Sequence, residues 1–419
     1  MSYPDTAADA RSPAKPLRIE VRALRSGELS TMLNLMCGSF GMAPDRAHPL
    51  FYGDPYFNLQ FKRGLFVGGK LVSCLTVSEG MVWLRSRLMP IAGIAGVCTD
   101  EQFRGRGYAS RLLLETLKFL HRKNYPFVGL YADPSLVPFY QRLGWQPIGQ
   151  QMRMAVFSRS IPRHSGANAA ASLQPSHLPA IESLHREMTT GLSGRFYRDG
   201  KRWDWVAKQV QGFVVKLGSG ELTGYALYRL HHNSTGDEIV EITEMMARNE
   251  QAEIALWSRL ASVGGAVGIQ YAGPLEDAVR LIQSLHRVGV EDEAAITAHQ
   301  TTGMLIRVVS LSQAVSATLA NSSSVHHPFA ITSRDWAQGS NESVTIKPDG
   351  SGLRVIAGKH AADWIEGRLD MITLLLTGNL SVHSAQSRQL LSASSQGAFE
   401  QAAALYPWER FGVSTADRF

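Results

Sequence analysis

The order of apolar and polar positions near residue 100 predicts a strand, a short turn and a helix. Residues 88–99, LMPIAGIAGVCT, are apolar and β-branched in places, and two acidic residues follow them, a pattern typical of a buried strand. Beyond the turn, Leu113, Leu117 and Leu120 recur at i, i+4 and i+7, which predicts a helix with one face toward the core.

The turn itself, residues 104–107, consists of two arginines and two glycines. A helix start exposes unpaired N–H groups and the positive end of the helix dipole, so an anion is its natural ligand. Glycines allow the backbone to approach that ligand, and the arginines add charge that suits phosphate. The turn is not a P-loop, which requires G-x-x-x-x-G-K-[S/T]. It is not a dinucleotide fingerprint either, because Ser110 stands where that motif has its third glycine.

The flanking sequence predicts further strands. Residues 63–77 form two apolar runs around Gly68-Gly69, which predicts a hairpin with a two-residue turn. Residues 125–149 indicate a strand, a short helix and a final strand. Residues 158–177 are rich in Ser, Ala, Pro and Gly, and they predict a linker or a strand-exchanging connection.

The second part of the chain, from residue 178 to about 308, loosely repeats this order of strands and helices. It contains no Q-x-x-G-x-G turn between residues 238 and 252, so it is a second domain of the same kind without the glycine turn, or an unrelated α/β domain. After residue 303 the pattern changes again, to a hairpin around Asp349-Gly350 and two apolar helical segments, 361–364 and 369–376. We therefore predict three domains, at residues 17–157, 170–308 and 309–419.

Composition narrows the class of protein. The 419 residues exceed one ordinary domain, and the apolar content is that of a soluble globular chain. The net charge is +6, but the basic residues are scattered, so we expect no nucleic-acid partner. The first sixteen residues are polar and predict a disordered tail, and no apolar run is long enough for a membrane span. Three unclustered cysteines favour a reducing, cytoplasmic setting without a disulfide framework.

Two motifs resemble the GNAT acyltransferases, which bind acetyl-CoA. Gln102, Gly105 and Gly107 match the Q-x-x-G-x-G turn that holds the cofactor pyrophosphate in that family. Tyr140, followed by Gly144 and Trp145, is similar to the tyrosine and x-x-x-G-[F/Y/W] signal at the close of the GNAT fold. Asp133 stands where many members carry asparagine, which leaves its contact with the cofactor open.

The order of the three parts resembles the enhanced-intracellular-survival (Eis) family of bacterial acetyltransferases. The resemblance implies an α+β fold built of α/β layers, with two GNAT-like domains in tandem and a C-terminal domain like sterol carrier proteins. Only the first GNAT-like domain would carry the cofactor turn. It also implies acetyl transfer from acetyl-CoA to a primary amine, such as a polyamine, an aminoglycoside or a lysine side chain. A homo-oligomer, hexamer or trimer, is expected on the same ground.

The resemblance also assigns roles to residues. Tyr140 would be the general acid for the leaving CoA thiolate, and the C-terminal carboxylate of Phe419 would be the general base. No metal is expected. The backbone of the strand before the turn would hold the pantetheine arm, and the turn would hold the pyrophosphate. These cofactor-binding residues are Val97, Thr99, Arg104, Gly105, Arg106, Gly107, Tyr108 and Ala109.

The chemistry sets the demands on those residues. A tyrosine pKa of about 10 lies above a thiol pKa of about 8.5, so proton transfer to the thiolate is uphill by roughly 2 kcal/mol. An alkylamine with a pKa of about 10.4 must be deprotonated before it reacts. The strand of residues 93–99 carries no carboxylate for that step. Asp133 or a residue of the second domain is the other candidate for the base.

Several alternatives stay open at this point. Tyr140 is a half-buried packing residue if the chain is a non-catalytic acyl-CoA or lipid-binding protein rather than an enzyme. An N-terminal or lysine acetyltransferase of peptides shares the chemistry and differs in the acceptor. The paired histidines 231–232 and 326–327 are read as surface residues, because neighbours on a strand point to opposite faces. Phe40 and Trp83 are candidates for the acceptor pocket, with core packing the favoured role.

Overall fold

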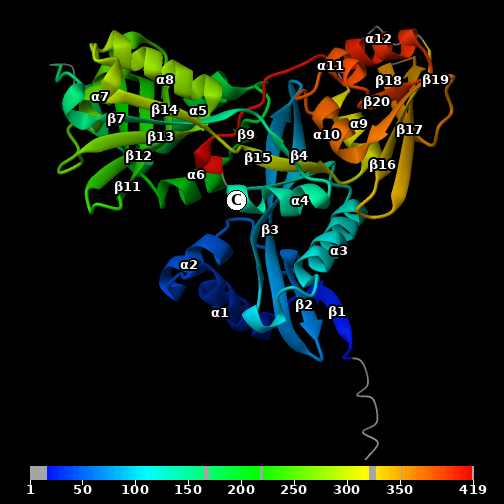
Figure 1. The fold of residues 1–419 in the computed structure, drawn as a ribbon. Coiled ribbons are helices and arrows are strands. Elements are labelled where there is room, and N and C mark those ends of the chain that lie inside the picture. Colours follow the sequence, from blue (N-terminus) through cyan, green and yellow to red (C-terminus); the bar gives the residue numbers. More distant parts are fainter. Residues whose placement is uncertain (1–16, 165–168, 218–219, 320–326, 351, 418–419) are drawn as a thin grey trace, which may run out of the picture.

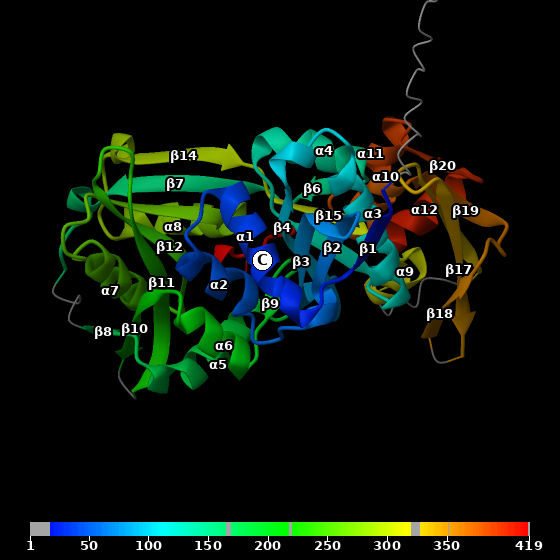
Figure 2. The ribbon, with the colours of Figure 1, turned by 90° about the horizontal axis from the view of Figure 1, so that it is seen from below.

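The computed structural model describes residues 17–164, 169–217, 220–319, 327–350 and 352–417. Three β-sheets, each covered by helices, follow one another across the molecule, and the sheet that begins the chain lies between the other two (Figure 1). The view turned by 90° shows the same order (Figure 2). In the described part of the chain, no helix is both long and apolar enough to cross a bilayer.

The first sheet has the order β1-β2-β3-β4-β5-β15-β6, and β9 pairs with β3 at Met81 and Val82. Helices α1 and α2 pack on one face of the sheet, against Cys74 and Cys98. Helix α3 packs on the other face, where its leucines contact Val77 of β3 and its neighbours. The glycine hairpin, the strand before the turn and the helix after it are confirmed. The elements are β1 (Ile19–Ala23), β2 (Lys62–Val67), β3 (Lys70–Leu84), β4 (Arg87–Thr99), β5 (Phe127–Leu130), β6 (Gln146–Ile148), β9 (Phe196–Tyr197), β15 (Met304–Val308), α1 (Leu29–Phe40), α2 (Pro44–Tyr52), α3 (Tyr108–Arg122) and α4 (Val137–Arg142).

The second sheet has the order β14-β7-β13-β12-β11-β10-β8. Alternate residues of its strands pack on opposite layers: Val215 lies in the cluster with α7 and α8, and Val214 lies in the cluster with α5 and α6. The elements are β7 (Gln151–Phe157), β8 (Ala170–Ser172), β10 (Gln211–Leu217), β11 (Glu221–His232), β12 (Glu238–Ala247), β13 (Gly268–Pro274), β14 (Ile296–Thr301), α5 (Leu178–Thr189), α6 (Gly200–Ala207), α7 (Glu250–Leu260) and α8 (Leu275–Arg287).

The first two units exchange strands, which corrects the predicted boundaries. Strand β15, expected to close the second domain, lies in the first sheet, where Leu305 pairs with Leu130 of β5 and Pro147 of β6. Strand β7, expected in the first domain, lies in the second sheet between β14 and β13. An apolar pattern indicates that a strand is buried, but it does not indicate which sheet the strand joins. The exchange ties the two units into one body.

The third sheet has the order β18-β17-β16-β19-β20. The helix predicted at residues 361–364 is wrong, because β19 begins at Asp363 and runs parallel to β16, with Ile365 fully buried between its neighbours. The helix at 369–376 is confirmed as α10. The likeness of this unit to sterol carrier proteins stays a prediction. The elements are β16 (Phe329–Asp335), β17 (Ser340–Asp349), β18 (Gly352–Ala357), β19 (Asp363–Arg368), β20 (Leu391–Ala393), α9 (Leu311–Thr318), α10 (Leu369–Leu376), α11 (Val382–Ser387) and α12 (Gln396–Leu405).

Candidate active site

The arginine and glycine turn lies at the start of α3 and is open to solvent. Gly105 and Gly107 have φ angles of +74° and +75°, a conformation that disfavours other residues, and a Cβ at either position would meet no atom within 4 Å. Gly107 is the N-cap of α3, and no side chain caps the helix. The first N–H groups of the helix are therefore left for a ligand, and Arg104 and Arg106 beside them are exposed.

Strand β4 has a free edge just before this turn. It pairs with β5 only from Ile91 to Ile94, and a bulge follows in which Gly96 has a φ of +62°. A Cβ on Gly96 would lie 2.7 Å from Met36 Cε, so packing also requires glycine there. Beyond the bulge, β4 continues to Thr99 without a partner on the β5 side among the described residues.

The backbone of Val97 and Thr99 faces that free edge. The N–H of Asp100 donates to Val72 O of β3 at 2.8 Å, so the groups of Asp100 point toward β3. Because successive residues of a strand alternate, the N–H and C=O of Val97 and Thr99 point away from β3. The Arg104 side chain already donates to Thr99 O at 3.3 Å. These two residues and the turn form one continuous line of backbone groups that an extended ligand with a phosphate end would fit.

Tyr140 of α4 is buried, with 6% of its surface exposed. Its ring lies 6.1 Å from the ring of Trp145 at an interplanar angle of 73°. Burial raises the pKa of the Tyr140 phenol to about 12. The loop after α4 requires Gly144, whose φ is +90° and whose Cβ would lie 2.8 Å from Arg307 Nη1. The Gly144-Trp145 motif therefore marks a tightly packed turn that fixes the position of Tyr140.

Asp133 has a local role. It caps the short 3-10 helix at Pro134–Leu136, accepting hydrogen bonds from Ser135 N at 2.9 Å and from Ser135 Oγ at 2.6 Å. The carboxyl is fully exposed, and the hydrogen bonds from Ser135 lower its pKa. A cap of this kind explains the aspartate without a ligand, and it makes Asp133 a poor general base.

A cavity of about 500 Å³ lies between the first unit, the second unit and the end of the chain. Its walls come from the β3 edge, the end of α2, the β9–α6 segment and residues just before the C-terminus. Four carboxylates face three guanidinium groups there, which leaves one excess negative charge. The charged and aromatic lining residues are Asp54, Glu79, Asp199, Asp417, Arg198, Arg202, Arg229, Tyr56, Tyr125, Phe196, Tyr197 and Trp205.

Two of the carboxylates are held by tyrosines. Tyr125 donates a hydrogen bond to Glu79, and Tyr56 donates one to Asp199. Burial and the Asp199 hydrogen bond raise the pKa of Tyr56 to about 12. These phenols therefore stay protonated at neutral pH, and the carboxylates they bind stay able to accept a cation. Sequence reasoning missed Glu79, although it is the one acidic residue within the long apolar strand β3.

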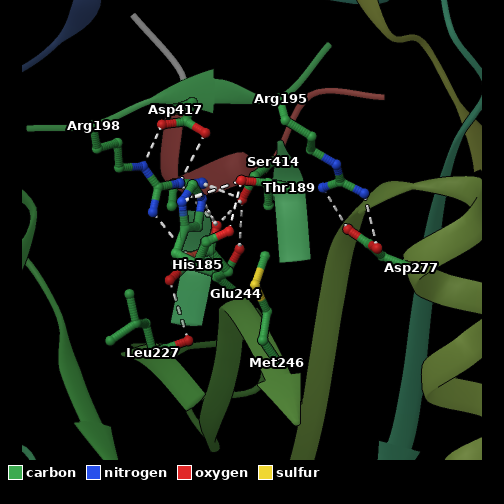
Figure 3. A network of polar contacts seen from close by, with 12 residues as sticks. His185, Thr189, Arg195, Arg198, Leu227, Glu244, Met246, Asp277, Ser414 and Asp417 are labelled. Atoms are coloured by element: carbon green, nitrogen blue, oxygen red, sulfur yellow. Dashed lines mark hydrogen bonds and ion pairs between the residues drawn. The ribbon is translucent and has the colours of Figure 1, made fainter. Parts of the chain in front are cut away.

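Ser414 and Asp417, near the end of the described chain, bind Glu244 and Arg198 (Figure 3). Asp417 accepts two hydrogen bonds from Arg198, at 2.6 and 2.8 Å, and both residues also line the cavity. Phe419 itself lies outside the described residues.

The remaining sequence candidates lie elsewhere. Phe40 is not a core residue, because 47% of its surface is exposed, and neither Phe40 nor Trp83 lines the cavity. His231 is half-buried and His232 is exposed, both near the end of β11. Residue 326 lies outside the described chain, and His327 is exposed. Within the described ranges, no group of three His, Cys, Asp or Glu side chains is placed to hold a metal ion.

The comparisons with known proteins agree with this geometry. Residues 20–148 match a family model described as an acetyltransferase (GNAT) domain, and residues 194–308 match a second GNAT acetyltransferase model. The sequence has no significant match among curated proteins. The chain therefore carries two GNAT acetyltransferase domains in tandem, and it is an enzyme of the acyltransferase class.

Solved structures share the fold over almost the whole chain. A GCN5-related N-acetyltransferase from Anabaena variabilis is 16% identical, covers 94% of this chain and 98% of its own, and has a TM-score of 0.75. A probable N-acyltransferase from Enterococcus faecalis is 18% identical over 96% of this chain and 100% of its own, with a TM-score of 0.76. Eis1 from Mycobacterium abscessus is 18% identical over the same shares, with a TM-score of 0.65.

Proposed function

We propose that this GNAT-type acetyltransferase moves an acetyl group from acetyl-CoA to a primary amine bound in the cavity between its two GNAT units. The acceptor would be a polyamine, an aminoglycoside or a lysine side chain. The observation that carries the proposal is the free edge of β4 running directly into the uncapped start of α3. An anionic, extended cofactor fits this arrangement, because the strand edge binds a chain and the helix start binds a phosphate.

The cofactor would be held mainly by the backbone. Val97 and Thr99 would bind the pantetheine arm, and residues 104–109 would bind the pyrophosphate, with Arg104 and Arg106 adding charge. The residues present fit the ligand, since the turn is open and its glycines leave room for close approach. Acetyl-CoA would supply the acetyl group when bound. The residues of this chain would bind and orient the two substrates and move the protons.

Tyr140 is proposed as the general acid. Its raised pKa of about 12 makes proton transfer to a thiolate of pKa about 8.5 uphill by about 5 kcal/mol, more than the roughly 2 kcal/mol of an unperturbed tyrosine. A turnover of 1–10³ s⁻¹ corresponds to a barrier of roughly 13–17 kcal/mol, so this cost is compatible with catalysis. A buried phenol also stays protonated throughout the neutral range, which a proton donor requires.

The C-terminal carboxylate of Phe419 is proposed as the general base. Asp417, the last described residue, lines the cavity, and Phe419 stands two positions after it in the sequence. The excess negative charge of the cavity favours a cationic acceptor, and its aromatic walls would pack on the alkyl part of an amine. We further propose a homo-oligomeric, cytoplasmic protein whose third unit resembles sterol carriers, on the family resemblance alone.

The test is a coupled assay for release of the CoA thiol from acetyl-CoA. Spermidine, kanamycin and a lysine-containing peptide serve as acceptors, and mass spectrometry identifies the acetylated product. We expect at least one amine to be acetylated well above the hydrolysis background. Tight binding of acetyl-CoA without acetyl transfer to any amine would favour the acyl-CoA-binding alternative instead.

A further inference from the structure

Glu79 places a carboxylate on a stretch of β3 that has one strand partner. Between residues 77 and 80 the described chain pairs β3 with β4 alone, because the pairing with β2 ends at Thr76 and the pairing with β9 begins at Met81. The cavity opens at this stretch, and Glu79 lines it. Glu79 is half-buried and is the only acidic residue of the strand. Burying a charge is costly unless the charge is paired, so this carboxylate needs a partner.

The three other carboxylates of the cavity already have partners in the protein. Arg198 donates two hydrogen bonds to Asp417, at 2.6 and 2.8 Å. Arg202 Nη2 lies 3.4 Å from the Asp54 carboxylate. Asp199 caps α6, where its side chain accepts a hydrogen bond from Arg202 N at 3.0 Å. Each of these side chains is therefore held by a neighbouring residue of the chain.

The Glu79 carboxylate has no cationic partner among the residues that the structure describes. Its Oε1 accepts a hydrogen bond from Tyr125, and its Oε2 accepts none within the described ranges. Arg202 donates to the backbone oxygen of Glu79, at 3.1 Å, and not to the carboxylate. Burial and the hydrogen bond to Glu79 raise the pKa of Tyr125, so the phenol remains a hydrogen-bond donor at neutral pH. Oε2 is therefore left to bind a cation that enters the cavity.

The register of the first sheet places Glu79 near the point where β4 leaves β5. Glu79 lies directly opposite Ala92 of β4, and the last β4–β5 pair on the chain is that of Ile94. Glu79 and Ile94 are diagonal neighbours on one face of the sheet, and such residues are roughly 7–8 Å apart. In the proposed function the pantetheine arm passes Thr99 and then Val97, so its thioester end would lie toward Ile94.

Tyr125 draws the Glu79 carboxylate away from that point. Tyr125 stands two positions before Phe127, the residue of β5 that pairs with Ile91. Because β4 and β5 are parallel, the phenol is level with the start of β4, and the hydrogen bond directs the carboxylate that way. A general base must come within hydrogen-bond distance of the nitrogen that reacts. A carboxylate held farther off suits a different group of the acceptor.

We propose that Glu79, held by Tyr125, binds a second, non-reacting ammonium group of the acceptor. This inference rests on the proposed function, in which a primary amine reacts at the thioester end of the pantetheine arm. One nitrogen would react near Ile94, while the other would pair with Glu79 Oε2 and lie among the aromatic residues of the cavity wall. The acceptor is therefore an amine with at least two cationic nitrogens, such as a linear polyamine. A monoamine would leave the Glu79 charge unpaired.

The test compares kcat/KM for cadaverine and pentylamine, which share one carbon chain and differ in the second amino group. The wild-type protein should favour cadaverine about 10- to 100-fold, the change expected for one charge-assisted hydrogen bond. Glu79→Gln keeps the size of the side chain and the oxygen that Tyr125 binds, and it should lose this preference. A preference that survives in the variant, or a wild-type protein without any preference, would overturn the proposal.

Glu241→Gln is the matched control. Glu241 is also a half-buried glutamate on a strand, β12, and it does not line this cavity, so this variant should keep the preference for cadaverine. Tyr125→Phe is the second variant, and it carries the test if Glu79→Gln fails to fold. It keeps the Glu79 charge but removes the group that directs it, so the preference should fall several-fold. An unchanged preference in Tyr125→Phe would contradict the proposed arrangement.

Calorimetry separates this proposal from the proposed function. Cadaverine is titrated into the wild-type, Glu79→Gln and Glu241→Gln proteins with CoA present, so that no transfer can occur. If no amine is acetylated, yet cadaverine binds Glu79→Gln at least tenfold more weakly than the other two proteins, the cation site stands and the acetyl transfer falls. If amines are acetylated, yet all three proteins bind cadaverine equally, the proposed function stands and the Glu79 site falls.

Discussion

Replacing Gly107 by glutamate should destroy acetyl-CoA binding without unfolding the protein. A Cβ at this position meets no atom within 4 Å, so the cost to folding is the left-handed backbone alone, about 1–2 kcal/mol. That is small against the 5–15 kcal/mol that typically stabilise a native domain. The effect on the ligand is larger, because the new carboxylate stands at the helix start that would hold the pyrophosphate.

The electrostatic part of this effect can be estimated. Two unit charges about 5 Å apart repel by about 1 kcal/mol in water and by about 3 kcal/mol at the effective dielectric constant of a protein surface. The affinity should therefore fall about 5- to 200-fold per phosphate charge. Gly107→Gln isolates this contribution, because glutamine has the same size and backbone strain without the charge. Gly236→Glu, at another left-handed glycine with open surroundings, controls for charge and strain far from the turn.

Isothermal titration calorimetry with acetyl-CoA measures the three variants, and thermal unfolding checks that each is folded. Gly236→Glu should bind like the wild type, Gly107→Gln should bind more weakly, and Gly107→Glu should bind weakest. Equal affinity of the Gly107→Glu and Gly107→Gln proteins would show that no anion sits at this helix start, and the assignment of the turn would be withdrawn.

Three further predictions follow from the site and the buried network. Tyr140→Phe should lower kcat by about 10²-fold or more while the Kd for acetyl-CoA stays constant, since it removes a proton and keeps the ring; equal turnover would end the general-acid assignment. A few residues added after Phe419 should lower kcat by about 10²–10⁴-fold, whereas the same residues at the N-terminus should not, as the CoA-release assay would show. Burial and the Arg198 charge lower the pKa of His185 to about 3. Below about pH 6.5 the unfolded chain therefore binds a proton that the folded protein does not, and the free energy of unfolding decreases as the pH falls. Urea unfolding at pH 7 and pH 5 should show about 2 kcal/mol more loss in the wild type than in His185→Gln; equal losses would mean that His185 is not buried neutral.

Local patterns were enough to predict the elements that we propose as the cofactor site. The strand before the turn, the four-residue turn and the helix after it are contiguous, and the periodicity of their apolar positions and the glycines specify them together. The hairpin at Gly68-Gly69 was predictable for the same reason, because two-residue turns need the left-handed backbone that both glycines adopt. The segment at 361–364 was predicted wrongly because a few apolar residues fit a helix and a buried strand equally well, and pairing with β16 decided for the strand.

The proposed acceptor side of the site exists only in the tertiary structure. Its cavity brings together the edge of β3, the end of α2, the β9–α6 segment and the chain end, which no local pattern relates. Arg198 and Asp417 meet although 219 positions separate them, and both appear as ordinary charged residues in the sequence. The exchange of β7 and β15 between sheets is likewise invisible to periodicity, which reports that a strand is buried and not which sheet buries it.

The sequence by itself therefore determined the strand, turn and helix start that we propose as the cofactor site, because one contiguous stretch of backbone forms them. The tertiary structure alone decided how the cavity that we propose for the acceptor is formed, how Asp417 is held beside it and how far burial raises the pKa of Tyr140. Burial and the pairing of charges depend on what packs around a residue, and its chain neighbours do not encode those long-range contacts.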